Sequence, residues 1–237
     1  MTANADESVI EPQRGRRIRR AMRSIEAAAI AGLLHSVLSL VATGLLLSAP
    51  DPGDGDAAIA EWYLDDANQR RMILGVNLLT MSAIMFVWFV AVVRRRVGSR
   101  ENRFFGTVFF GSGLLVTASW LVVGVLYAAP AVAAWTFDVA PDAGTVAMSQ
   151  AGGLTMASLV TTRLEAVFIV STTTVGRLSE AFPRWLVLAG YVVGLTLLLV
   201  PVPNVFLTWV FPIWVGITSA MLFIRRDDIK SVVTPPT

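Results

Sequence analysis

The chain contains no cysteine, one lysine and one histidine among its 237 residues. Without cysteine it has no disulfide, no zinc–thiolate or iron–sulfur site and no thiolate nucleophile. Because His35 is the single histidine, a bis-histidine haem site cannot form within one chain. Charged residues make up 15% of the chain, whereas soluble domains contain about 25%. The scarcity of charge and a hydrophobic content of 55% indicate an integral membrane protein.

Several sequence motifs of enzymes and metal sites are also missing. The chain has no Gly-rich phosphate loop, no HExxH zinc motif and no GxSxG nucleophile motif. The acidic segment 51–56 does not match a calcium-binding EF-hand loop, because Ala58 occupies a ligand position. We therefore expect no metal, no cofactor and no catalytic residues, and we expect that the protein is not an enzyme.

Six apolar runs approach or exceed the roughly 20 residues that a helix needs to cross about 30 Å of hydrocarbon. They are 25–48, 72–93, 104–129, 146–175, 185–200 and 204–224. Within hydrocarbon the backbone must satisfy its own hydrogen bonds, so these runs are predicted to be helices. The prediction is an all-α bundle of six transmembrane helices over 25–224. A basic tail at 1–24 precedes the bundle and a second tail at 225–237 follows it.

The basic residues lie at one set of helix ends. They cluster at 14–23, 94–103, 177–184 and 225–230, whereas the opposite loops contain only Arg70 and Arg71. The positive-inside rule therefore predicts that both termini are cytoplasmic. The bias toward arginine over lysine fits a GC-rich bacterial genome, and the six apolar runs predict a multi-pass membrane protein. This placement indicates the lipid bilayer, and not a nucleic acid, as the partner of the basic residues.

Three ionisable residues fall inside the predicted helices: His35, Arg163 and Glu165. Such residues cost about 2.5–3.5 kcal/mol each on membrane insertion, so they are candidates for function. At about 1.5 Å per residue, all three are predicted near the middle of the membrane. Arg163 belongs to neither set of helix ends, so the topology does not explain it.

The run 146–175 carries a polar stripe. Ser158, Thr162 and Glu165 recur at helical spacing and are expected to face the bundle interior. Arg163 points about 160° away from Glu165, so the two cannot form a simple pair within the helix. For Glu165 the depth-matched partners are His35 and Asn77. For Arg163 we consider backbone carbonyls, a neighbouring subunit, a bound anion or water.

Two interpretations of this polar cluster remain open. In the first, His35, Asn77, Ser158, Thr162, Arg163 and Glu165 line a pocket that binds or transports a small solute, or relays a proton. In the second, the same groups only bond helices together. The second interpretation fits a structural or regulatory subunit of a larger membrane complex. Trp120 lies deep in its run and is predicted to be a packing residue.

Gly190 and Gly194 form a GxxxG pattern in the run 185–200. Small residues at this spacing let helix backbones approach closely. We expect packing within the bundle, with a homo-oligomer contact as the alternative.

Three stretches carry a resemblance to a protein family: 62–94, 182–199 and 210–223. They resemble uncharacterised six-helix integral membrane proteins of actinobacteria, a family defined by a domain of unknown function. The resemblance implies six helices in a bacterial cytoplasmic (inner) membrane. It implies no activity, so it transfers no role to any residue.

Overall fold

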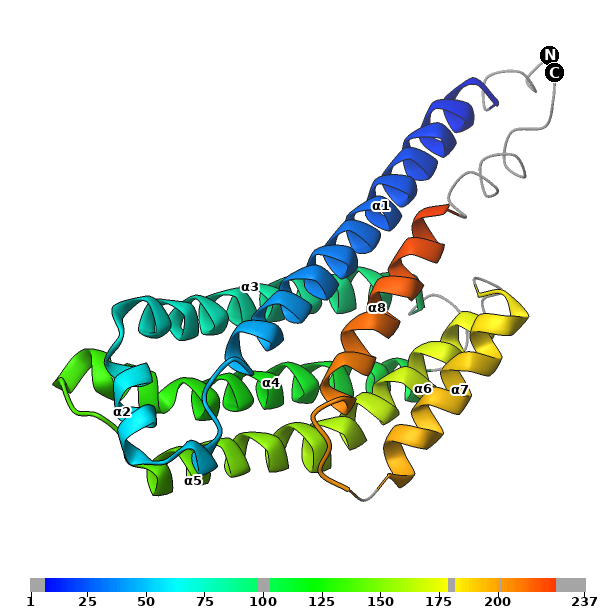
Figure 1. The fold of residues 1–237 in the computed structure, drawn as a ribbon. Coiled ribbons are helices and arrows are strands. Elements are labelled where there is room, and N and C mark those ends of the chain that lie inside the picture. Colours follow the sequence, from blue (N-terminus) through cyan, green and yellow to red (C-terminus); the bar gives the residue numbers. More distant parts are fainter. Residues whose placement is uncertain (1–6, 98–102, 179–181, 201, 225–237) are drawn as a thin grey trace, which may run out of the picture.

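The structure is a computed structural model that describes residues 7–97, 103–178, 182–200 and 202–224. Within these ranges all regular structure is helical (Figure 1). The elements in chain order are α1 (Glu7–Leu46), η1 (Pro52–Asp54), α2 (Asp56–Leu64), α3 (Asp66–Val97), α4 (Arg103–Phe137), α5 (Ala143–Thr155), η2 (Met156–Thr161), α6 (Thr162–Leu178), α7 (Arg184–Leu199) and α8 (Leu207–Ile224). The predicted all-α class is therefore confirmed.

Five helical segments of the described chain are long and apolar enough to cross a membrane. They are Glu26–Leu46, Asp66–Arg94, Gly106–Phe137, Ala143–Leu178 and Leu207–Ile224. The remaining predicted span, 185–200, corresponds to α7, which has 16 residues. At about 1.5 Å per residue, α7 is about 24 Å long, less than the hydrocarbon core of about 30 Å.

Two helices extend beyond the predicted membrane-crossing runs. The apolar span Glu26–Leu46 agrees with the predicted run 25–48, while the helix that contains it, α1, begins at Glu7. α4 continues past the predicted run 104–129 and contains Pro130, because prolines are tolerated in membrane helices. The chain leaves α4 at Asp138, whose left-handed backbone (φ 53°) ends the helix. The predicted tail 225–237 lies outside the described residues, as do residues 1–6.

The helices pack as neighbours in the order α8, α1, α3, α4, α6 and α7. α1 contacts both α3 and α8, while α4 lies between α3 and α6. Phenylalanines from four of these helices are buried where they converge: Phe86 on α3, Phe109 on α4, Phe168 on α6 and Phe211 on α8. This aromatic core adjoins the candidate site.

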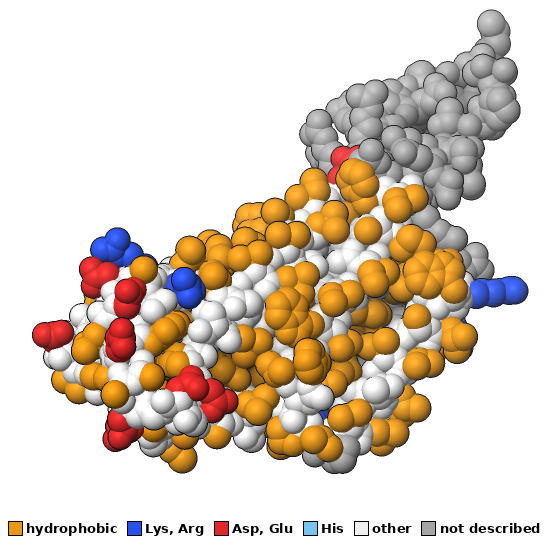
Figure 2. All heavy atoms as spheres, in the orientation of Figure 1, with side chains coloured by type: hydrophobic (Ala, Val, Ile, Leu, Met, Phe, Trp, Pro, Cys, Tyr) orange, Lys and Arg blue, Asp and Glu red, His pale blue; other side chains and the backbone are white. Residues whose placement is uncertain are grey.

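Short helices and helix ends form one pole of the molecule, which we call the acidic end. It comprises η1, α2, the start of α3, the end of α4 and the start of α5. Eight exposed acidic residues lie there: Asp51, Asp54, Asp56, Glu61, Asp65, Asp66, Asp138 and Asp142. Figure 2 shows acidic side chains gathered at this pole, whereas hydrophobic side chains cover the middle of the face in view.

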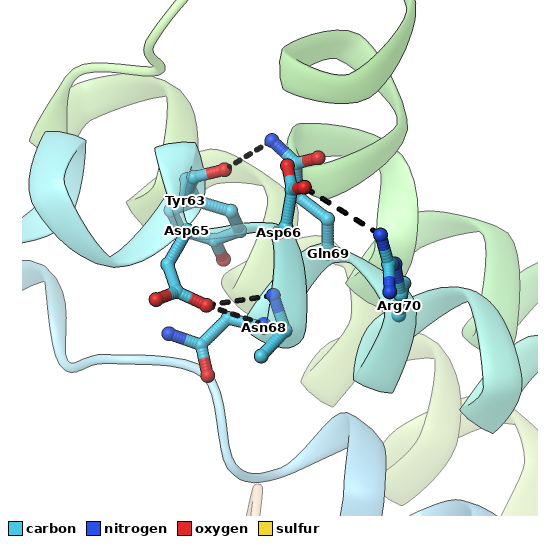
Figure 3. Close-up of polar contacts among 7 residues, drawn as sticks. Tyr63, Asp65, Asp66, Asn68, Gln69 and Arg70 are labelled. Carbon is cyan, nitrogen blue, oxygen red and sulfur yellow. Dashed lines mark hydrogen bonds and ion pairs between the residues drawn. The ribbon is translucent and has the colours of Figure 1, made fainter.

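Side-chain hydrogen bonds hold the acidic end together (Figure 3). The Asp65 carboxylate accepts from the backbone N–H of Asn68 at 3.0 Å and so caps α3. The Gln69 amide donates to the Tyr63 carbonyl at 2.8 Å. Tyr63 is buried, and this burial raises the pKa of its hydroxyl to about 12. The segment that follows the first acidic residues is thus a folded helix of the molecule, α2.

The two glycines of the GxxxG pattern face α6. A Cβ atom added at Gly194 would lie 2.7 Å from Val170 Cγ2 and 3.4 Å from the Ala166 carbonyl oxygen. A Cβ atom at Gly190 would collide with the Thr173 side chain. Because α6 covers this face, it is not available as a contact between subunits.

We predict that Gly194→Val destabilises the protein by about 1–3 kcal/mol, because the added atoms overpack the contact between α6 and α7. Thermal unfolding of the purified protein in detergent measures the effect. Gly111→Val on α4 is the matched control, because a Cβ atom there meets nothing within 4 Å. Equal thermal stability of the two variants would contradict the assigned packing.

Candidate functional site

The polar stripe on α6 begins in a π-helical segment, η2, which continues α5 into α6. Ser158, Thr162 and Glu165 are all buried, as the helical spacing predicts. The Ser158 hydroxyl donates to the Leu154 carbonyl, and the Thr162 hydroxyl donates to the Ser158 carbonyl, each at 2.6 Å. These two hydroxyls are therefore satisfied by their own helix, and Glu165 is the member of the stripe that reaches across to another helix.

Glu165 is fully buried and bonds to Trp120 on α4. The indole Nε1–H of Trp120 donates to Glu165 Oε1 at 2.8 Å. The second carboxyl oxygen, Oε2, has no hydrogen-bond partner among the described residues. Buried polar atoms are nearly always paired, so this unpaired carboxyl oxygen is a candidate for protonation.

His35 is held by Ser82 on α3. Its Nδ1 lies 2.8 Å from the Ser82 hydroxyl and 3.1 Å from the Ser82 carbonyl, while that hydroxyl also lies 3.0 Å from the His35 carbonyl. The opposite ring nitrogen, Nε2, is buried without a hydrogen-bond partner in the described part of the chain. Two aromatic rings contact the imidazole, with centroid distances of 4.7 Å to Phe86 and 6.1 Å to Phe211. The ring is thus fixed in place while one nitrogen stays free.

A cavity of about 10 Å³ lies between α1, α3 and α4, beside His35. That is the space one water molecule needs. Its walls are His35, Ser39, Leu79, Ser82, Ala83, Phe86, Val116, Thr117 and Trp120. We call this space the His35 cavity. Trp120 therefore borders the cavity and also bonds to Glu165.

Arg163 bonds to Thr162 of the polar stripe, whose hydroxyl oxygen accepts at 3.0 Å, and to two backbone carbonyls. Its guanidinium donates to the Ser158 carbonyl at 2.9 Å and to the Val200 carbonyl at 2.7 Å. Val200 is the C-cap of α7, where unpaired carbonyls create negative potential. The half-buried Arg163 thus links η2 to the end of α7. Of the four partners considered for Arg163, the structure provides backbone carbonyls.

Two predicted pairings are wrong. Asn77 is exposed on α3, and its amide donates to the Ile73 carbonyl of its own helix at 2.8 Å. Because Asn77 faces outward, it does not line the cavity or bond to Glu165. His35 and Glu165 do not hydrogen-bond to each other either, since their partners are Ser82 and Trp120 respectively.

The prediction for Trp120 missed its polar role. Its depth in the helix correctly indicated burial, but an indole N–H also needs an acceptor there. Glu165 was the available signal for this role, because a carboxyl group inside the membrane needs a hydrogen-bond donor and an indole N–H can supply one. Ser82 was also missed, because an isolated serine in an apolar helix carries no recognisable pattern.

The arrangement can exchange a proton or hold a water molecule. Among the described residues, no group of three histidine, aspartate or glutamate side chains converges as a metal site would require. The Ser82 hydroxyl lies against His35 Nδ1 and the His35 carbonyl, and both residues are buried. Glu165 Oε2 and His35 Nε2 are two of the seven buried side-chain atoms without a hydrogen-bond partner among the described residues, and Trp120 bonds to Glu165 and shares a cavity wall with His35.

Comparison with known proteins returned no match to any protein-family model, curated protein or solved structure. The resemblance to six-helix actinobacterial proteins is therefore neither supported nor contradicted.

We predict that Trp120→Phe destabilises the protein by about 1–3 kcal/mol, because Glu165 loses its hydrogen-bond donor. The loss should be much smaller in a Glu165→Met background, since no buried acceptor is then stranded. Chemical or thermal unfolding of both single variants and the double variant measures this coupling.

Trp214→Phe serves as the matched control for this cycle. Trp214 is also buried, but its Nε1 has no hydrogen-bond partner in the described chain. Its substitution should cost the same stability with and without Glu165→Met. A Trp120 effect that is equally independent of Glu165 would show that the bond contributes nothing.

Proposed function

We propose that the protein is a multi-pass protein of a bacterial cytoplasmic membrane, with α7 as a sixth crossing and both termini in the cytoplasm. The five long apolar helices support membrane insertion. The packing of α7 along α6 supports a sixth crossing. α7 is short, and Arg163 bonds to the Val200 carbonyl at the end of this helix. The clustered arginines and the opposite acidic end support the orientation.

Cysteine labelling tests this topology cleanly, because the natural chain has no thiol. Three exposed positions receive single cysteines: Thr136 at the end of α4, Arg184 at the start of α7, and Asn204 beyond α7. A membrane-impermeant maleimide should label Thr136→Cys and Asn204→Cys in intact cells stripped of their outer wall. Arg184→Cys should react only after lysis. Labelling of Arg184→Cys and Asn204→Cys from the same side would contradict a sixth crossing.

We also propose that the protein binds protons at Glu165 and passes them through the His35 cavity, without acting as an enzyme. The observation that carries this proposal is the orphan carboxyl oxygen of a fully buried glutamate. An ionised carboxylate in hydrocarbon needs a counter-charge, and no described cation contacts Glu165. Taking up a proton removes that charge.

The size of the cavity narrows the solute class. A space of about 10 Å³ admits one water molecule and nothing larger in this conformation. Chains of carboxyl, histidine and water are the usual proton relays inside membranes. The small solute is therefore a proton, and a water molecule in the cavity beside His35 would carry it between groups.

The second candidate is a structural or regulatory subunit of a larger membrane complex. The side-chain hydroxyls of Ser158 and Thr162 bond within their own helix, and Arg163 ties two helices together, which favours a purely structural cluster. The GxxxG face is already covered, so a partner would use the arginine-rich side of the molecule. The candidates differ in whether Glu165 exchanges protons.

We predict that purified protein in lipid vesicles carries protons down an imposed potential and that Glu165→Gln abolishes this flux. Gln keeps the size and an acceptor for Trp120 but cannot exchange a proton. A pH-sensitive dye trapped in the vesicles reports the flux, and infrared spectroscopy of the same samples reports the carboxyl C=O band of protonated Glu165.

Glu61→Gln is the control, because Glu61 is an exposed glutamate at the acidic end. It should leave both the flux and the buried carboxyl band unchanged. If wild-type vesicles carry no more protons than empty ones, and Glu165→Gln keeps wild-type thermal stability, proton transfer is wrong. If Glu165→Gln instead lowers the thermal stability and the wild type carries no flux, the result favours a structural or regulatory subunit.

A further inference from the structure

We propose that Trp120 couples the protonation of Glu165 to the opening of the His35 cavity. This inference rests on the proposed function, because it assumes that Glu165 exchanges a proton. It goes further by assigning a gate to that site and by naming the residue that moves.

Trp120 is placed for this role by its two contacts. Its indole nitrogen bonds to Glu165 at 2.8 Å, and its side chain forms part of the wall of the His35 cavity. Among the described residues it is the wall residue that bonds directly to Glu165. Glu165 itself is not part of the wall, so a change at the carboxyl reaches the cavity through the indole.

The strength of the Trp120–Glu165 bond depends on the charge of Glu165. Hydrogen bonds to an ionised carboxylate are about twice as strong as bonds between neutral groups. An ionised Glu165 therefore holds the indole firmly against α6 and keeps the cavity small. Protonation weakens this bond, which frees Trp120 to shift and lets water reach His35.

Other charged groups do not compete for Glu165. On its own helix, Arg163 is turned to the Val200 carbonyl, and Arg177 lies over the Tyr191 ring of α7. Tyr191 hydrogen-bonds with Thr174, and the described parts of α8 and η2 contain no titratable residue.

The helices on the cavity side add two further titratable residues that are buried in the described part of the chain. On α4, Tyr127 packs against Gly153, and on α1, His35 is bonded to Ser82. His35 borders the cavity, so it is the alternative origin of any pH dependence there, and the experiment must separate it from Glu165.

Ser39 provides a reporter of cavity opening. It lies on α1, one turn beyond His35, lines the cavity and is 1% exposed. A cysteine at this position would be the single thiol of the chain. Its reaction with a small water-soluble methanethiosulfonate is slow while the cavity is closed and fast when water enters.

The experiment measures this labelling rate for Ser39→Cys in lipid vesicles as a function of pH. Thr136→Cys, which is exposed, corrects for the pH dependence of thiol reactivity itself. We expect the corrected rate to rise by about tenfold as pH falls, equivalent to a tenfold larger open population. Adding Glu165→Gln or Trp120→Phe should make the rate high and independent of pH, whereas adding His35→Gln should preserve the pH dependence.

Two results would overturn the coupling. One is a corrected rate that does not change with pH although the infrared band shows Glu165 titrating. The other is a pH dependence that survives Glu165→Gln or disappears with His35→Gln. Absence of a titrating Glu165 band would instead refute the proposed proton binding itself, so the two failures are distinguishable.

Discussion

A carboxyl group buried in an apolar bundle must find a donor or take up a proton, and the arrangement around Glu165 follows from that requirement. The donor is the indole of Trp120, which ties α6 to α4. Since one indole N–H satisfies one oxygen, the other oxygen remains open to exchange. The phenylalanines of α3, α4, α6 and α8 around this region keep water out, which makes each unpaired polar atom costly. The polar cluster is therefore small, and each of its bonds matters.

Arg163, two positions before Glu165, also needs hydrogen-bond partners, and it finds them in a different way. Arg163 donates to two backbone carbonyls, one in the π-helical segment and one at the end of α7, and to the Thr162 hydroxyl. This placement separates the two ionisable residues of the helix into different roles. Arg163 stabilises the contact between α6 and α7, while Glu165 faces the cavity side through Trp120. The helical step between the two residues already required them to point in different directions.

Much of the architecture was predictable because hydrocarbon permits few backbone structures. Apolar length indicated the helices, and burial of Ser158, Thr162 and Glu165 followed from their spacing. The pairings were not predictable, because contacts between helices depend on rotation and tilt that one sequence does not encode locally. Asn77 illustrates this: its depth was suitable, yet its helix turns it outward. Trp120 illustrates the converse, since its apolar bulk concealed the N–H that Glu165 requires.

The hydrogen bond between Trp120 and Glu165 is the central claim, and nuclear magnetic resonance can observe it directly. The indole N–H resonance of Trp120, assigned by its loss in Trp120→Phe, would be followed across pH in lipid nanodiscs. We expect that this resonance shifts as Glu165 gains its proton and that Glu165→Gln removes the shift. A Trp120 resonance that follows pH identically in the wild type and in Glu165→Gln would contradict the claim.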